Sequence, residues 1–159
     1  MIKKKNFSKI YISSIFLLLL IISIFIAIIF EKTQKDNYKK IIRLNIETKV
    51  EENLSWKFLT ESNFKNVKIG QIYKIDFNVE NYGSTKSSGK AIYKIYPVLL
   101  KKYFVEIDCF CYTKQSLLPG EKSKYSITFY IDPEMLSDPR TIDIQNIDIS
   151  YIFLDSKNG

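Results

Sequence analysis

The sequence predicts an all-β domain that follows one N-terminal transmembrane helix. Three observations support this fold class. Apolar and polar residues alternate with a period of two in several stretches after residue 40, glycine or proline marks many of the ends of these stretches, and an uncharged apolar run lies near the N-terminus. Such alternation is typical of strands with one buried face, and no helical periodicity is sustained in the region after residue 40.

The apolar run spans residues 10–30, which contain no charged side chain. At 1.5 Å per residue it extends about 31 Å as a helix, which matches a hydrocarbon core of about 30 Å. Four lysines precede it, as in a signal peptide, but the run is longer than the usual apolar region and no small-residue cleavage site follows. We therefore expect an uncleaved signal anchor at 10–30, with residues 1–9 as a short tail on the cytoplasmic or matrix side.

Residues 31–40 are charged and are predicted to form a linker. Basic residues are equally frequent on both sides of the apolar run, so charge alone does not orient it. Because the N-terminal tail is very short and a folded domain is translocated largely regardless of its charge, we expect the N-terminus inside and the C-terminal domain outside.

The predicted domain covers residues 41–155, with a tail at 156–159. The side chains expected to face inward along its strands are Ile42, Leu44 and Ile46; Trp56 and Phe58; Tyr73, Ile75, Phe77 and Val79; Tyr125, Ile127, Phe129 and Ile131; and Ile149, Tyr151 and Phe153. About seven short strands in this length are typical of an immunoglobulin-like β-sandwich.

Three connections between these strands are predicted. Residues 84–90 are read as a Ser/Gly/Lys loop, and Leu118–Glu121 places Pro and Gly as a type II turn requires. Residues 132–140 form the one long connection. Its acidic side chains do not have the spacing of a calcium loop, and Met135 within it is predicted to be a packing residue.

The charge of the chain argues against a nucleic-acid-binding function. The net charge is +7, but four lysines among the first nine residues leave 20 basic and 17 acidic residues, a net of +3. Only Arg43 and Arg140 are arginines, whereas nucleic-acid-binding proteins rely on arginine and cluster their charge. Lys94, Lys101 and Lys102 are candidates for docking on a partner, with solvated strand ends as the alternative.

Cys109 and Cys111 are the only cysteines. If both lie in one strand, their side chains share a face roughly 6.6 Å apart, so the two sulfurs can converge on one soft ion. A disulfide at that separation lies near the upper limit of the usual Cα spacing.

The chain has no histidine, which removes the commonest metal ligand and general base. Two thiolates then suit Cu(I) better than Zn(II), which needs four ligands; the alternative is that both are core residues.

The face of the strand on which the cysteines lie helps to decide between metal binding and core packing. In an uninterrupted strand the cysteines share the core face of Val105 and Ile107, which supports a packing role. A metal-binding role requires that the strand ends near Asp108 or contains a bulge, so that the pair leaves the core face for the rim. Phe110 and Tyr112 favour such a disruption, because two aromatic side chains make a poor solvent face.

The sequence resembles the CtaG family of cytochrome c oxidase assembly proteins over nearly the whole predicted domain. The segments that carry the resemblance are Leu54–Phe58, Gly89–Pro97, Tyr103–Phe104, Cys109–Tyr112 with Gln115, Pro119–Glu121, Phe129–Pro133 and Ser150–Phe153.

The resemblance implies a membrane-anchored copper chaperone, not an enzyme, whose immunoglobulin-like domain faces the periplasm or the mitochondrial intermembrane space. By this resemblance, Cys109 and Cys111 bind Cu(I) and deliver it to the CuB centre of the oxidase large subunit. A copper-dependent homodimer, an upstream copper donor and a thiol reductant are the further partners that it implies.

In one respect the chain departs from the family. Members usually carry a further cysteine in a longer stretch between the anchor and the first strand, and this chain has none there. Two alternative functions stay open on the sequence: an anchored interaction module with structural cysteines, and a thiol oxidoreductase that uses the pair.

Overall fold

The computed structural model describes residues 4–37 and 40–156, with side chains in the helical part from Tyr11 to Lys32. Helix α1 runs from Lys4 to Asn37, and its segment Tyr11–Lys32 is long and apolar enough to cross a membrane. It fits a single-pass membrane anchor. Most of the predicted linker is helical, because α1 continues beyond Glu31. The predicted tails at 1–9 and 156–159 lie partly outside the described residues.

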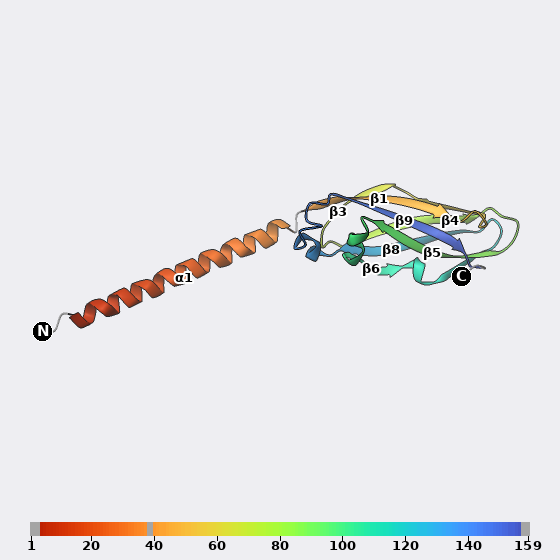
Figure 1. Ribbon diagram of the computed structural model, residues 1–159. Coiled ribbons are helices and arrows are strands. Elements are labelled where there is room, and N and C mark those ends of the chain that lie inside the picture. The colour runs from red at the N-terminus through yellow and green to blue at the C-terminus, as the bar shows by residue number, and fades with distance from the viewer. Residues whose placement is uncertain (1–3, 38–39, 157–159) are drawn as a thin grey trace. The chain divides into compact units, whose positions relative to one another are not determined.

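The chain separates into two compact units, residues 1–37 and 38–159. Within the second unit, the described strands form two sheets that face each other (Figure 1). The five-stranded sheet has the order β3-β1-β9-β5-β7, with strands β3 Phe64–Lys68, β1 Ile41–Val50, β9 Asn146–Asp155, β5 Ser87–Tyr96 and β7 Lys114–Leu117. The four-stranded sheet has the order β2-β4-β8-β6, with strands β2 Trp56–Thr60, β4 Tyr73–Asn81, β8 Lys122–Ile131 and β6 Phe104–Cys109.

All neighbouring strands are antiparallel except β1 and β9, which pair in parallel. Three 3-10 helices connect strands: η1 Val98–Lys102, η2 Phe110–Tyr112 and η3 Pro133–Leu136. The prediction of an immunoglobulin-like sandwich is confirmed, with nine strands among the described residues rather than about seven.

The predicted inward-facing side chains form the core between the sheets. All of them are buried except Tyr73 and Tyr125, which are partly buried against the same cluster. Met135 is fully buried, as predicted for a packing residue. Gly120 has the positive φ of 74° that the predicted type II turn requires, and the Glu121 N–H donates to the Leu118 carbonyl at 3.0 Å.

The predicted loop at 84–90 is wrong in its second half, because β5 begins at Ser87 and contains Gly89. A Cβ at Gly89 would lie 2.9 Å from Leu54 Cδ2 and 3.2 Å from the Leu154 carbonyl oxygen. Glycine therefore allows Leu54 to pack closely on the strand, and it does not mark a turn.

Asn81, at the end of β4, is a fully buried polar side chain. Its amide donates to the carbonyls of Thr85 and Leu117, both at 3.0 Å, and its Oδ1 accepts from the Gly83 N–H at 2.9 Å. One side chain thus satisfies backbone groups of the β4–β5 loop and of β7, which joins these segments at one end of the sandwich.

Asp138 holds the long connection at 132–140 against the domain. Its Oδ2 accepts from the Tyr103 hydroxyl at 2.9 Å, Lys102 at 3.2 Å and Arg140 at 2.9 Å, and the side chain is 12% exposed. Asp132 instead caps η3 by accepting from the Glu134 N–H. The hydrogen bonds from Arg140 hold the pKa of Asp138 well below its usual range.

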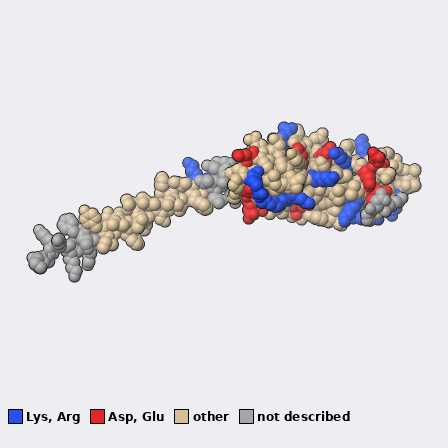
Figure 2. Space-filling view, viewed as in Figure 1, with Lys and Arg blue, Asp and Glu red and all other residues tan. Residues whose placement is uncertain are grey.

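Basic and acidic side chains are interspersed on the face of the domain shown in Figure 2. Several opposite charges of the described domain pair, for example Lys124 with Asp76 at 3.0 Å and Lys122 with Glu80 at 3.5 Å. This mixture agrees with the small net charge of the region, 20 basic against 17 acidic residues outside the four N-terminal lysines.

Replacing Asn81 with alanine should destabilise the domain by about 1–3 kcal/mol, because buried backbone groups lose their partner. The full chain in detergent micelles can be unfolded with urea and followed by the fluorescence of Trp56, the single, buried tryptophan. Asn78→Ala, at an exposed position of the same strand, is the matched control and should change little. Equal unfolding midpoints for the two variants would contradict the role given to Asn81.

The stability of the domain should fall in acid in a way that depends on Asp138. Its pKa is lower in the folded than in the unfolded chain, so its contribution is complete above the ordinary carboxyl pKa of about 4 and is lost as pH falls below that value. Between about pH 5 and pH 2, the free energy of unfolding of Asp138→Asn should fall less steeply with decreasing pH than that of the unaltered chain. The exposed Asp143→Asn should decline like the unaltered chain; an unchanged slope in Asp138→Asn would refute the assignment.

Candidate metal centre

Strand β6, at the edge of the four-stranded sheet, carries the first half of the candidate site. It contains a bulge: Glu106 lies opposite Phe129 and Asp108 lies opposite Thr128, so Ile107 is an extra residue between them. The predicted disruption of the strand is therefore present. The predicted core face of Val105 and Ile107 is wrong, because Phe104 is the buried side chain before the bulge and Ile107 is 52% exposed.

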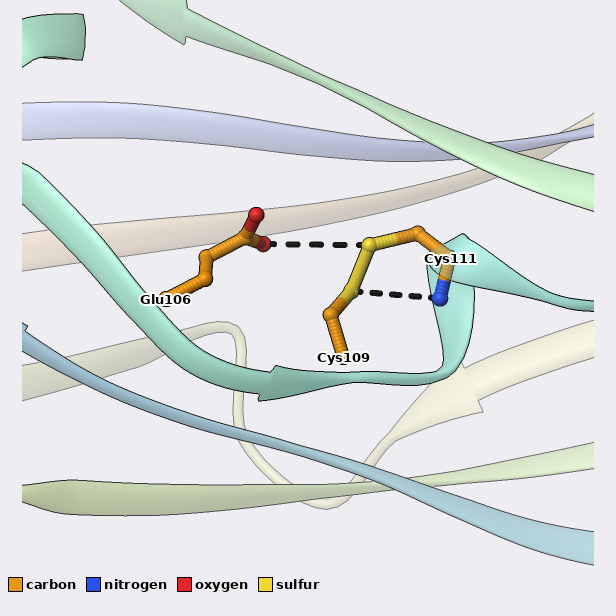
Figure 3. Close-up of side chains that lie close together, drawn as sticks. All are labelled: Glu106, Cys109 and Cys111. Carbon is orange, nitrogen blue, oxygen red and sulfur yellow. Dashed lines mark hydrogen bonds between the residues drawn. A yellow bond between two sulfur atoms is a disulfide. The ribbon is translucent and has the colours of Figure 1, made fainter.

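The strand ends at Cys109, and Phe110–Tyr112 form the 3-10 helix η2. Because Cys111 lies in this turn, the two Cα atoms are 5.1 Å apart, not the roughly 6.6 Å expected for one strand. The pair forms a disulfide in the structure, and the Cys111 N–H donates to Cys109 Sγ at 3.2 Å (Figure 3). The spacing lies well inside the usual range for a disulfide.

Both cysteines are buried, at 4% and 7% exposure. From the sequence we expected a metal-binding pair to leave the core face for the rim; the pair instead lies at the edge strand but remains covered. Phe104 faces the core at the start of β6, so Ile107 lies on the outer face; the bulge then reverses the parity of the strand, so Cys109 faces the interior, and the turn η2 brings Cys111 beside it.

Phe110, between the cysteines, fixes the turn by packing its ring into the core. The ring stacks on Tyr125 with centroids 5.5 Å apart and lies 5.5 Å from Phe77, both in the four-stranded sheet. It also lies 5.6 Å from Phe153 and 6.0 Å from Tyr151 of the five-stranded sheet. The ring thus contacts both layers, and the flanking cysteines are positioned by it.

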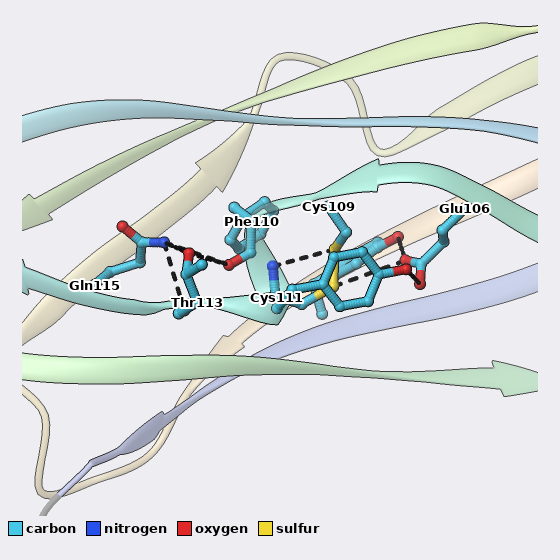
Figure 4. Close-up of a disulfide and its surroundings, with 8 residues drawn as sticks. Glu106, Cys109, Phe110, Cys111, Thr113 and Gln115 are labelled. Carbon is cyan, nitrogen blue, oxygen red and sulfur yellow. Dashed lines mark hydrogen bonds between the residues drawn. A yellow bond between two sulfur atoms is a disulfide. The ribbon is translucent and has the colours of Figure 1, made fainter.

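Gln115 closes the far side of the turn (Figure 4). Its Nε2 donates to the Phe110 carbonyl at 3.3 Å and to Thr113 Oγ1 at 2.7 Å, while the Thr113 N–H also donates to the Phe110 carbonyl at 3.4 Å. These bonds satisfy the backbone of the short helix and explain why glutamine follows the cysteine pair at this distance.

Glu106 brings a carboxylate beside the sulfurs (Figure 3). Its Oε1 lies 3.9 Å from Cys111 Sγ and accepts from the Tyr151 hydroxyl at 3.4 Å, while Oε2 accepts from the Tyr112 hydroxyl at 3.3 Å. Burial raises the pKa of Glu106 against the opposing effect of these hydroxyls. Burial and the nearby Glu106 raise the pKa of Tyr93 to about 12.

Among the described residues, Glu106, Cys109 and Cys111 form a group that can hold a metal ion, with one ligand atom from each within 4.8 Å of the others. The sequence pointed to the two cysteines but missed Glu106, because strict alternation puts it on the opposite face from them. Recognising the bulge at Ile107 is the signal that would have included it.

The lysines singled out for docking all lie on the surface of the described domain. Lys94 and Lys101 are exposed, and Lys102 pairs with Asp138 at 3.2 Å. Lys101 is also close enough to lower the pKa of Glu106 electrostatically. Of these three lysines, Lys101 is therefore the one shown to lie near the site.

Comparison with known proteins gives a consistent family. The sequence profile described as "Cytochrome c oxidase assembly protein CtaG/Cox11" matches residues 26–155. Curated proteins named cytochrome c oxidase assembly protein CtaG include one from Nitrobacter hamburgensis, 33% identical over 76% of this chain, and one from Ehrlichia ruminantium strain Welgevonden, 35% identical over 80%.

The chain spans 56% of the Nitrobacter relative and 72% of the Ehrlichia relative. A solved PapD-like domain of human CEP192 is similar over 76% of this chain and 87% of that chain, at 13% identity and a TM-score of 0.31. That likeness is too weak to inform the function.

The family profile covers most of the chain, including the whole described sandwich and both cysteines. The chain therefore belongs to the CtaG/Cox11 family of cytochrome c oxidase assembly proteins.

Proposed function

We propose that the chain is a copper chaperone, which binds Cu(I) through Cys109 and Cys111 and delivers it to the CuB centre of the oxidase large subunit. The observation that carries the proposal is the convergence of the two sulfurs at the edge of a rigid sandwich in a member of an oxidase assembly family. Two soft sulfurs and no histidine suit a soft monovalent ion held for transfer.

Copper binding requires the reduced pair. Two electrons and two protons convert the disulfide to two thiols, and a thioredoxin-like reductant supplies them in an oxidising compartment. Cu(I) then replaces the thiol protons, which pass to solvent. A two-sulfur site leaves the ion open to incoming ligands, so transfer proceeds by exchanging one thiolate at a time.

The remaining parts of the proposal follow from the same role. The chain is a single-pass protein of the inner membrane, with its N-terminus inside and its sandwich in the periplasm or intermembrane space. It takes copper from an upstream donor, docks on the oxidase large subunit and forms a copper-dependent homodimer. It acts as a carrier rather than as an enzyme.

A thiol oxidoreductase is the second candidate, and the disulfide itself favours it. The Cys111 N–H that points at Cys109 Sγ would also stabilise a thiolate there. This candidate predicts turnover of a mixed disulfide with a substrate thiol, whereas the chaperone predicts copper retention.

Reduced full chain in detergent micelles, loaded with Cu(I) and passed over a Cu(I) chelator, should retain copper, and Cys109→Ser with Cys111→Ser should abolish retention. Met135→Leu is the matched control, because it removes a buried sulfur elsewhere in the domain. The fluorescence of Trp56 reports whether each variant is folded. Copper retention by a folded double-serine variant equal to that of the unaltered chain would exclude the two cysteines as ligands.

Cells that lack this chain should assemble an oxidase large subunit depleted of CuB copper, because the donor is missing. Metal analysis of the purified oxidase measures this directly. The chain with Met135→Leu should restore copper, and the double-serine variant should not. Full restoration by the double-serine variant would instead support an interaction module with structural cysteines.

A further inference from the structure

The carboxylate of Glu106 gives the cysteine pair a third donor of a different chemical kind. It is half-buried, and its Oε1 lies 3.9 Å from Cys111 Sγ (Figure 3). The ligand atoms of all three residues lie within 4.8 Å of one another. The donor set is therefore two sulfurs and one oxygen, arranged around one small volume at the end of β6.

The distance between the Cys111 sulfur and the Glu106 oxygen is close to that of two ligands of one tetrahedral ion. With metal–sulfur bonds of about 2.3 Å and metal–oxygen bonds of about 2.1 Å, tetrahedral angles place sulfur and oxygen about 3.6 Å apart. The observed separation of Cys111 Sγ and Glu106 Oε1 is 3.9 Å, so Glu106 needs little movement toward Cys111. The two sulfurs are bonded to each other in the disulfide, and after reduction they must separate before both can bind one tetrahedral ion.

The carboxylate is also oriented by its surroundings. The Tyr112 hydroxyl donates to Oε2, and the Tyr151 hydroxyl donates to Oε1 from the facing sheet. Such partners of a ligating carboxylate fix its direction and favour metal binding. Tyr112 and Tyr151 thus hold the Glu106 carboxylate in its position beside the sulfurs.

The carboxylate should contribute differently to the binding of Cu(I) and of a divalent ion. Cu(I) prefers soft sulfur and low coordination, so the carboxylate adds little to its binding. A divalent ion of intermediate softness accepts thiolate and carboxylate together, and the three negative charges offset its own charge in a half-buried place.

We propose that the reduced chain binds Zn(II) through Cys109, Cys111 and Glu106, with the fourth position open to water or to an incoming ligand. The inference rests on the thiol pair of the proposed function but does not depend on copper delivery. Binding releases the thiol protons to solvent and transfers no electrons. Zinc then covers the thiols until Cu(I), which needs the sulfurs alone, displaces it.

The test is a titration of the full chain in detergent micelles, reduced with a phosphine, with Zn(II) alone against a chromophoric zinc chelator. Glu106→Gln keeps the shape of the side chain but loses its charge and should weaken Zn(II) binding by about tenfold or more. Asp108→Asn, which removes an exposed carboxylate two residues away, is the matched control and should bind like the unaltered chain. Cu(I) retention should be the same in Asp108→Asn and in the unaltered chain.

A second variant, Glu106→Asp, tests the inference independently in case Glu106→Gln does not fold. Glu106→Asp keeps the negative charge but withdraws the oxygen by one methylene, and it should also weaken Zn(II). Co(II) in place of Zn(II) should give the absorption of a tetrahedral thiolate site in the unaltered chain, and this absorption should change in both variants.

The outcomes separate the two proposals. Unchanged Zn(II) binding in both Glu106 variants overturns the zinc inference while copper retention leaves the chaperone intact. Failure of the reduced unaltered chain to bind either ion overturns both. Tight Zn(II) binding that depends on Glu106, without copper retention, supports the zinc site and overturns the chaperone.

Discussion

The packing of the Phe110 ring is the interaction on which the geometry of the site depends. The ring lies between the two cysteines in sequence and between the two sheets in space, against Tyr125 on one side and Phe153 on the other. Emptying such a place in a core costs about 3–5 kcal/mol. The turn therefore cannot move far without disturbing the sandwich, and the positions of the two sulfurs follow from the packing of the core.

The bulge at Ile107 is the second constraint, and it acts on the chemistry. By adding one residue to β6, it places Glu106 on the same side of the strand as Cys109, beside Cys111. The edge of the sheet tolerates this because β6 has a hydrogen-bonded neighbour only in β8 within the described sandwich. A regular strand would have given a two-sulfur site with no oxygen beside it.

These two features together make one site with two donor sets. In the proposals above, the two sulfurs alone suit Cu(I) held for transfer, and the sulfurs with the carboxylate suit Zn(II), with its fourth position open. The low exposure of the two sulfurs limits competition from water for a bound ion. Because Cys109 lies at the end of the edge strand β6, the pair is also close to the surface on which a partner could dock.

The amino-acid sequence by itself predicted the apolar helix, most of the strands, most of the inward side chains and the two cysteines as candidate ligands, because hydropathy period records which faces are buried and residue type records which side chains carry metal-binding atoms. It also placed the Leu118–Glu121 turn and the burial of Met135. Only the tertiary structure decided that Gly89 lies inside a strand, that the cysteines are buried, and that Glu106 joins them. A bulge reverses the parity from which a strand is read, and the Tyr151 hydroxyl that orients Glu106 comes from 45 residues away in sequence. Such contacts are set by how the sheets pack, which no local pattern contains.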